Sequence, residues 1–246
     1  MLENNLILCM KWGNKYPAEF VNRLYRMVKR NLSLPFTMVC LTDDATGIDE
    51  NVRCYPIPSL ELPDGLPERG WKKLTTFSAP LYDLQGTALF LDLDIVILRN
   101  IDHFFTHEAD NPQKALWIIK DFKHQHRITG NSSVYRFKIG DFPDLLPYFR
   151  AHFADIRAKF RNEQAYLSDF VHQQSALRYF PKGWCLSYKY HALYPPVLDY
   201  LLPPRKPDCD ILIFHGEVNP DQAIVGGGGK WYRHVKPAAW LADYWS

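Results

Sequence analysis

Apolar residues recur along this chain with two alternating spacings. Residues 6–10 and 36–44 form short apolar runs typical of buried strands, whereas residues 17–30 between them place apolar side chains on one helical face. Pro17 suits the first turn of that helix. A strand, a helix and a second strand in this order predict a parallel α/β sheet.

The pattern in the rest of the chain is more mixed. A weak strand is expected at residues 52–58, a helix at residues 71–82 that Pro80 ends or kinks, and the strongest strand at residues 87–98. The further expected elements are strands at residues 115–122, 130–137 and 210–216 and helices at residues 144–159, 163–179 and 237–245. Because no linker or internal repeat interrupts the pattern, we expect a single α/β domain.

The strongest strand contains two acidic residues, in the run FLDLDIVIL of residues 90–98. An unpaired carboxylate that is removed from water costs several kcal/mol or becomes protonated. Alternation along a strand would place Asp92 and Asp94 on one face, close enough to repel each other. A divalent cation at the carboxyl end of the strand would remove this repulsion. The alternative is a structural pair held by Arg99 or by backbone amides.

A second Asp-x-Asp pair, Asp208 and Asp210, shows how weak this motif is by itself. It follows a proline-rich turn, and we expect it in a solvated loop. His215 ends a later expected strand and is a candidate third ligand, because an imidazole beside two carboxylates suits manganese. Since a lone histidine at a strand end is usually not a ligand, a metal site with Asp92 and Asp94 requires the fold to bring the three together.

Composition excludes several other classes of protein. The chain has 246 residues, 47% of them hydrophobic, and a net charge of +2, so we expect a soluble globular protein without general affinity for nucleic acid. The five cysteines show no CxxC spacing, which favours reduced thiols in a cytoplasmic protein. The N-terminus does not resemble a signal peptide, and no apolar run approaches the ~18 residues that span a bilayer.

Several segments resemble, in order, the core of GT-A-fold glycosyltransferases, in particular glycosyltransferase family 8 and related bacterial glycan-synthesising enzymes. The longest is WKKLTTF followed by GTALFLDLDIVILRNID, where a lysine-bearing helix precedes the strand with the Asp-x-Asp pair. The others are MKWGNKY, GNSSVYRF, NEQAYL and FHGEVNP, at residues 10–16, 130–137, 162–167 and 214–220. Each segment is short, but their shared order makes the resemblance specific.

The resemblance implies a GT-A (Rossmann-like) mixed sheet flanked by helices. It divides the single domain into a nucleotide-binding half at residues 1–100, a donor-sugar and acceptor half at residues 101–225, and a C-terminal loop and helix at residues 226–246. It implies a metal-dependent hexosyltransferase that moves a hexose from a nucleotide-sugar, such as a UDP-sugar, to a glycan or lipid-linked glycan acceptor. Relatives retain the anomeric configuration, so we expect retention.

The resemblance also assigns roles to residues. The candidate metal ligands, for Mn²⁺ or Mg²⁺, are Asp92, Asp94 and His215. The candidate catalytic residues, near the reacting sugar, are Glu163, Gln164 and Asp121. The residues expected to contact the nucleotide-sugar are Lys11, Trp12, Gly13, Tyr16, Thr42, Asp43, Lys73, Asp92, Leu93, Asn131, Ser132, Ser133, Gly216 and Lys230. For Lys73, a solvated helix face is the alternative, and for Tyr16 it is a place in the core.

Two positions depart from the family pattern. Glu163 replaces an aspartate, and Asn219 stands where the family has a lysine that contacts the diphosphate. The glycine run at residues 226–229 lacks the spacing of a Walker loop. We expect this run to form a mobile loop over the diphosphate, in which Lys230 or Arg233 replaces the missing lysine.

Two other functions share part of this pattern. A sugar-1-phosphate nucleotidyltransferase has the same fold, but it carries a glycine-rich basic loop after the first strand that MKWGNKYPAEF lacks. A non-catalytic carbohydrate- or metal-binding protein would use the same residues without turnover. The basic and aromatic residues at 230–245 suggest either contact with the inner face of a membrane, where lipid-linked acceptors lie, or a packed terminal helix.

Overall fold

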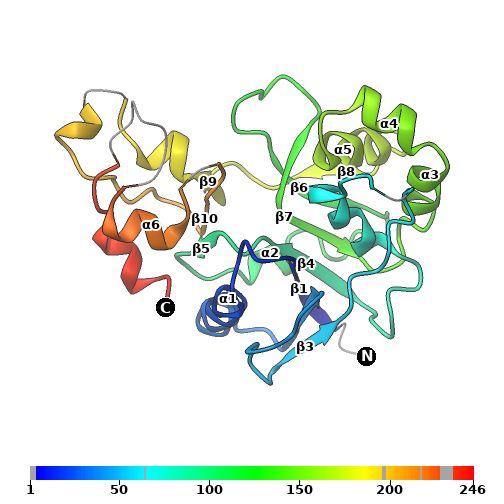
Figure 1. Cartoon of the computed structure of the whole chain (residues 1–246), viewed down its shortest axis with the longest axis horizontal. Helices are drawn as coiled ribbons and strands as arrows, with labels where there is room; N and C mark the ends of the chain where they lie inside the picture. Colours follow the sequence, from blue (N-terminus) through cyan, green and yellow to red (C-terminus); the bar gives the residue numbers. More distant parts are fainter. Residues whose placement is uncertain (1–3, 64, 196–197, 217, 228–234) are drawn as a thin grey trace.

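A seven-stranded mixed sheet forms the centre of the single domain (Figure 1). The computed structural model describes residues 4–63, 65–195, 198–216, 218–227 and 235–246. The strands lie in the order β3-β2-β1-β4-β7-β6-β8, and of these β7 runs antiparallel to both of its neighbours. Their bounds are Asn5–Lys11 (β1), Phe36–Thr42 (β2), Val52–Tyr55 (β3), Thr87–Leu91 (β4), Leu116–Lys120 (β6), Gly130–Lys138 (β7) and Leu177–Tyr179 (β8).

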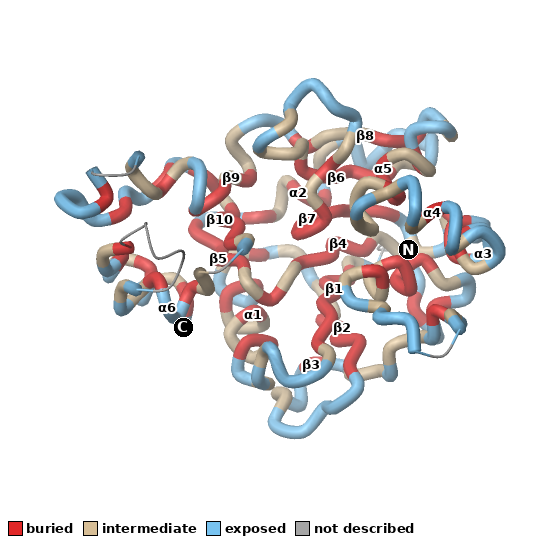
Figure 2. Tube along the Cα trace, turned by 45° about the horizontal axis from the view of Figure 1, so that its top comes forward, coloured by how far each residue is buried: buried red, intermediate tan, exposed pale blue. Residues whose placement is uncertain are grey.

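Strands β1 to β4 are parallel, as the sequence predicts, and their side chains alternate between two faces. In β1, Ile7 and Cys9 join the core on one face, whereas Leu6, Leu8 and Met10 join the core on the other. Both faces are apolar because both are covered, which is typical of parallel sheets. Figure 2 shows the resulting buried centre, with exposed loops around it.

Helices cover both faces of the sheet. Helix α1 (Ala18–Asn31) begins directly after Pro17, as expected, and packs Leu24 and Met27 into the same core as Ile7. The helices on the other face are η1 (Arg69–Phe77), α3 (Leu145–Ala151), α4 (Phe153–Lys159) and α5 (Glu163–Gln173).

Three expected helices are shorter than predicted. The segment at residues 71–82 is a 3₁₀ helix that stops before Pro80. Residues 144–159 form two helices because the backbone of His152 leaves the helical conformation, and residues 163–179 contain α5 followed by strand β8. The apolar pattern does not reveal these breaks, because the segments on both sides of each break face the same core.

The expected single strand at residues 87–98 is wrong, because it consists of two strands in two sheets. Strand β4 ends at Leu91, and the chain then turns into a separate three-stranded sheet. The strands of this second sheet are β5 (Ile95–Ile97), β10 (Ile211–Ile213) and β9 (Cys185–Ser187). The turn between β4 and β5 carries Asp92 and Asp94, so their proximity comes from a turn and not from alternation along one strand.

Short elements without a clear sequence signal complete the fold. They are α2 (His103–Thr106), the π-helical η2 (Tyr188–Ala192), the 3₁₀ helix η3 (Leu198–Tyr200) and α6 (Pro220–Val225). The terminal helix is a 3₁₀ turn, η4 (Ala239–Asp243); its Leu241 and the following residue Trp245 pack into the core. The five cysteines are free thiols. In the described ranges, no helix is long and apolar enough to cross a membrane.

Candidate active site

A pocket of about 240 Å³ opens at the carboxyl ends of β1 and β4. Four segments meet there: the end of β1 with the turn before α1, helix η1, the turn between β4 and β5, and the start of α5. The lining residues are Met10, Trp12, Lys15, Tyr16, Gly70, Lys73, Asp92, Leu93, Asp94 and Glu163. Most of them are site residues that the sequence predicts, and the fold brings them together from widely separated parts of the chain.

Asp92 is paired with the ammonium group of Lys73. Lys73 Nζ lies 2.6 Å from Asp92 Oδ1 and 2.8 Å from Oδ2. Burial by itself would lower the pKa of Lys73, but the charges of Asp92 and Glu163 outweigh this effect and raise that pKa. Lys73 is therefore a cation held inside the pocket, and the alternative of a solvated helix face is wrong.

Arg99 does not hold this acidic pair. Its Nη2 lies 2.8 Å from Asp208 Oδ1 and its Nε lies 3.2 Å from Asp210 Oδ1. His103 Nε2 also lies 3.1 Å from Asp210 Oδ2. The second Asp-x-Asp pair thus has an arginine and a histidine as partners of its own, and Asp210 is not the solvated loop residue that we expected, because its side chain is only 16% exposed.

Asp94 has a neutral partner in place of a cation. The hydroxyl group of Tyr16 donates a 2.7 Å hydrogen bond to Asp94 Oδ2. Burial, and then the charge of Asp92, raise the pKa of Asp94 to about 6. When both carboxylates are ionised, Lys73 supplies one positive charge to the pair. The turn therefore carries an excess negative charge that a bound cation would neutralise.

Glu163 completes the acidic part of the pocket as the first residue of α5. Asn162 caps the start of the helix, and its side chain accepts a 3.2 Å hydrogen bond from the amide of Ala165. Ser132 Oγ donates a 2.9 Å hydrogen bond to Glu163 Oε1. A Cβ atom at Gly70 would lie 3.1 Å from Glu163 Oε2, so the glycine lets this carboxylate lie against η1.

Asn131, Ser132 and Ser133 of β7 support the pocket without lining it. The carbonyl oxygen of Ser133 accepts a 2.9 Å hydrogen bond from the amide of Asp92. The amide of Ser132 donates to Gln164 Oε1 at 3.3 Å, and Asn131 Oδ1 accepts from the amide of Ser133 at 3.0 Å. These residues therefore position the acidic turn and the start of α5.

Four further predicted residues form the adjoining edge between β1 and β2. The amide of Gly13 donates a 2.8 Å hydrogen bond to Asp43 Oδ2. The side chains of Thr42 and Lys11 both donate to the carbonyl oxygen of Asp44, at 2.9 Å and 3.1 Å. None of these four residues lines the pocket, and Lys11 is committed to the backbone.

Lys15 is a pocket residue that the sequence does not single out. Its Nζ lies 4.4 Å from the centre of the Tyr16 ring, and its side chain forms no ion pair with any described carboxylate. Burial raises the pKa of Asp94, and the charge of Lys15 is one of the influences that oppose this rise. The only signal in the sequence is a second lysine in KWGNKY.

His215 is not part of the group that lines the pocket. Its Nε2 shares a 2.7 Å hydrogen bond with Ser187 Oγ, and its ring stacks on Phe122 at an interplanar angle of 8°. Burial, and then the charge of Lys189, lower the pKa of His215. Across the described part of the chain, no three histidine, cysteine, aspartate or glutamate side chains form a group that could hold a metal ion. The predicted triad with Asp92 and Asp94 is thus not assembled.

Three solved structures with a similar architecture are glycosyltransferases. A galactosyltransferase, LgtC, in complex with donor and acceptor sugar analogs aligns with a TM-score of 0.56 and 12% identity over 87% of this chain and 88% of LgtC. An active-site mutant of LgtC aligns with a TM-score of 0.58 and 13% identity over 87% of this chain and 89% of the mutant. The bifunctional glycosyltransferase WbbM, in its apo form, aligns with a TM-score of 0.56 and 11% identity over 89% of this chain and 47% of WbbM.

This chain has the GT-A fold. No protein family and no curated protein matches its sequence. At 11–13% identity, the likeness establishes the GT-A architecture, and the residues of this chain must carry the argument about chemistry.

Two further predicted residues, Asp121 and Gly216, do not line the GT-A pocket. Asp121 closes its own turn, because its Oδ1 accepts hydrogen bonds from the amides of Lys123 and His124 at 2.8 Å and 2.6 Å. Gly216 follows the second sheet with a φ of +104°, a conformation that favours glycine. Lys230 lies outside the described residues.

Proposed function

We propose that this protein is a metal-dependent glycosyltransferase that moves a hexose from a nucleotide-sugar, in particular a UDP-sugar, to a glycan acceptor. The observation that carries the proposal is the excess negative charge of the Asp92–Asp94 turn beside Lys73, at the edge of the sheet where α/β proteins bind ligands. The GT-A fold is shared with LgtC, which was solved with donor and acceptor sugar analogs.

Asp92 and Asp94 would hold Mn²⁺ or Mg²⁺, because they are adjacent oxygen ligands with one negative charge in excess. His215 would join them if it exchanged its hydrogen bond to Ser187 for the metal. When bound, such an ion supplies Lewis-acid stabilisation of the leaving diphosphate.

The donor would bind between two lysines, one of which is held in an ion pair and one of which is not. Lys73 is fixed by Asp92, whereas Lys15 has no ion-pair partner among the described carboxylates and can move to the diphosphate of the donor. Trp12 and Tyr16 provide aromatic surfaces for the nucleobase at the same side of the pocket. Lys15 would thus supply the charge that the family places at the position of Asn219.

Transfer would occur beside Glu163. The bond from the anomeric carbon to the phosphate oxygen breaks, the bond to the acceptor oxygen forms, and the acceptor proton passes to the leaving phosphate. The Glu163 carboxylate, held by Ser132, would stabilise the positive charge that develops on the sugar. Gln164 would position this segment through the amide of Ser132. We propose retention of configuration.

The acceptor would be a surface or lipid-linked glycan at the inner face of a membrane. Supporting this, residues 198–202 expose a group of apolar side chains, with Leu201 67% and Tyr200 53% exposed. Arg205 and Lys206 follow after two prolines, and a basic, apolar surface suits an anionic bilayer.

The test is release of nucleoside diphosphate from a panel of UDP-glucose, UDP-galactose and their N-acetyl forms, with and without Mn²⁺. We expect turnover that requires Mn²⁺ and that Asp94→Asn lowers about 100-fold or more. Asp208→Asn is the matched control, because it changes the same motif at a side chain that is 96% exposed. We expect it to retain full activity.

Three outcomes would contradict the proposal. Formation of pyrophosphate from a nucleoside triphosphate and a sugar 1-phosphate would identify a nucleotidyltransferase. Binding of sugar nucleotides without turnover would identify a binding protein. Equal losses in Asp94→Asn and Asp208→Asn would show that the effect does not arise in the pocket.

A further inference from the structure

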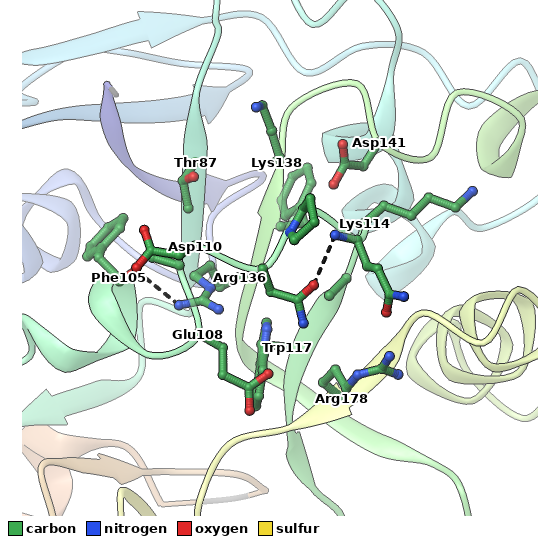
Figure 3. A pocket seen from close by; sticks show the side chains of 16 residues that line it. Thr87, Phe105, Glu108, Asp110, Lys114, Trp117, Arg136, Lys138, Asp141 and Arg178 are labelled. Carbon is green, nitrogen blue, oxygen red and sulfur yellow. Dashed lines mark hydrogen bonds between the residues drawn. The ribbon is translucent and has the colours of Figure 1, made fainter. Parts of the chain in front are cut away.

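A second cavity lies at the other end of β4 from the acidic turn. It has a volume of about 350 Å³ and is formed by the starts of β4 and β6, the end of β7 and the loop after α2 (Figure 3). Thr87, the first residue of β4, lines it, whereas Asp92 follows the last residue of the same strand. The cavity is therefore separate from the candidate active site.

Arg136 is the buried charge of this cavity. It lies on β7 between Leu89 of β4 and Trp117 of β6, and it is only 5% exposed. Its Nη1 donates hydrogen bonds to the carbonyl oxygens of Phe104 and Phe105, at 2.7 Å and 3.2 Å. Burial lowers the pKa of Arg136 to about 10, which leaves the guanidinium charged at neutral pH.

One edge of this guanidinium has no partner. Nη1 makes the two hydrogen bonds to α2, but Nε and Nη2 donate to no described residue, and no described carboxylate forms an ion pair with Arg136. The edge formed by Nε and Nη2 is the one that binds carboxylate and phosphate groups with two parallel hydrogen bonds. A buried arginine that lines an open cavity with this edge unpaired supplies the hydrogen-bond donors of a binding site for an oxyanion.

The other charged side chains that line the cavity form no described ion pair with Arg136. Figure 3 shows the side chains of Lys114 and Lys138 extending away from Arg136, and Glu108 and Asp110 on its side of the cavity. Both acidic residues lie in the loop after α2, where water screens their charge. They would compete with an anion, which makes them useful in a test.

We propose that this cavity binds an oxyanion, a phosphate or a carboxylate, carried by a molecule of about the size of a monosaccharide. Arg136 would donate to it from Nε and Nη2 while Nη1 keeps its bonds to α2. The volume suits a sugar phosphate or a uronic acid, since small-molecule pockets begin at ~300 Å³. This site is independent of the proposed glycosyl transfer.

The test is isothermal titration calorimetry of the full chain with inorganic phosphate, glucose 1-phosphate and glucuronate. Arg136→Lys keeps the charge but loses the paired donors, so we expect it to weaken binding about tenfold. Glu108→Gln removes a competing charge, and we expect binding to become about two- to threefold tighter. Preference for glucose 1-phosphate or for glucuronate then tells which oxyanion the site takes.

Two further variants keep the test decisive. Arg136→Lys also disturbs the hydrogen bonds to α2, so Ala109→Trp, at an exposed lining residue, offers a second way to block the cavity without touching the arginine. Lys15→Ala weakens the candidate active site and should leave this binding unchanged. Absence of saturable binding of all three anions, equal affinity in Ala109→Trp, or loss of binding in Lys15→Ala would each overturn the proposal.

Discussion

The chain contains two Asp-x-Asp pairs, and they lie in opposite environments. Asp92 and Asp94 line a pocket, in which Asp92 is paired with the ammonium group of Lys73 and Asp94 has a neutral tyrosine partner. Asp208 and Asp210 instead have Arg99 and His103 beside them.

The comparison teaches that enclosure and the neighbours of each carboxylate, which the motif does not encode, distinguish the two acidic pairs. The first pair retains an unbalanced negative charge in a partly enclosed place, where attraction for a metal ion is strong. The second pair also has one arginine for two carboxylates, but Asp208 is 96% exposed, so water screens the remaining charge, and ion pairs there contribute little. The three-residue motif is the same in both.

The largest expected difference between the two pairs is in the stability that is lost when the cation beside each pair is removed. Lys73→Met leaves Asp92 with an uncompensated charge at a side chain that is 20% exposed, and we expect a loss of about 3 kcal/mol in the free energy of unfolding. Arg99→Met, at a side chain that is 49% exposed, should cost less than about 1 kcal/mol. Urea unfolding of both variants measures the difference, and equal losses would break the comparison.

The second-largest expected difference between the two pairs is in how they make the free energy of unfolding depend on pH. The pKa of Asp94 is about 6 in the folded protein and about 4 in the unfolded chain. The folded state therefore binds more protons between these values, so this group's contribution to stability is present below pH 4 and lost as the pH rises through 6. Relative to Asp94→Asn, metal-free wild type should lose about 2 kcal/mol between about pH 4 and pH 7.5.

The control for this effect is Asp208→Asn, studied by urea unfolding at the same two pH values with a chelator present. We expect it to stay within about 0.5 kcal/mol of wild type at both, as surface substitutions usually do. If the free energies of unfolding of wild type and Asp94→Asn differ by the same amount at both pH values, the pKa of Asp94 is not raised on folding.

A smaller effect is expected at Lys15, which has no ion-pair partner among the described carboxylates. Lys15→Ala should raise the KM for the nucleotide-sugar about tenfold and change kcat less, because the lost charge would contact the diphosphate throughout the reaction. Lys29→Ala, in the last turn of α1, is the matched control and should leave both constants unchanged. A fall in kcat alone would place Lys15 at the transition state and not at donor binding.

The smallest expected effect is at the glycine beside Glu163. Gly70→Ala places a Cβ atom 3.1 Å from Glu163 Oε2, so the carboxylate must move by a few tenths of an ångström. We expect kcat to fall by several-fold with little change in stability, since small displacements of a reacting group lower rates more than they affect folding. Gly140→Ala has no atom within 4 Å of the added Cβ and is the control for space, although its φ of +91° adds strain.

Periodicity and short motifs predicted a large part of this molecule. The strand at residues 6–10, the helix after Pro17 and the parallel order of the first strands are confirmed, because local spacing and burial on both faces act in the same direction there. The candidate pocket residues Tyr16, Lys73 and Glu163 were also identified, although they are far apart in the sequence. Their identification came from resemblance and not from periodicity.

Other parts of the site depended on contacts that no local pattern encodes. The break between β4 and β5 was missed because Leu91 and Ile95 are both fully buried, although they belong to different sheets. The place of Lys15 in the pocket was missed because its exposure and its lack of a described ion-pair partner depend on neighbours in space. The hydrogen bond between His215 and Ser187 likewise depends on the second sheet, because Ser187 lies in its strand β9.

The sequence by itself determined the alternation of strands and helices, and it placed two carboxylates directly after an apolar strand, because hydrophobic burial follows local spacing. Only the tertiary structure decided which cation each carboxylate meets. Lys73 is brought to Asp92 by η1, and Arg99 is kept at Asp208 by the second sheet. Charge balance depends on distances in space, which the order of residues along the chain does not specify.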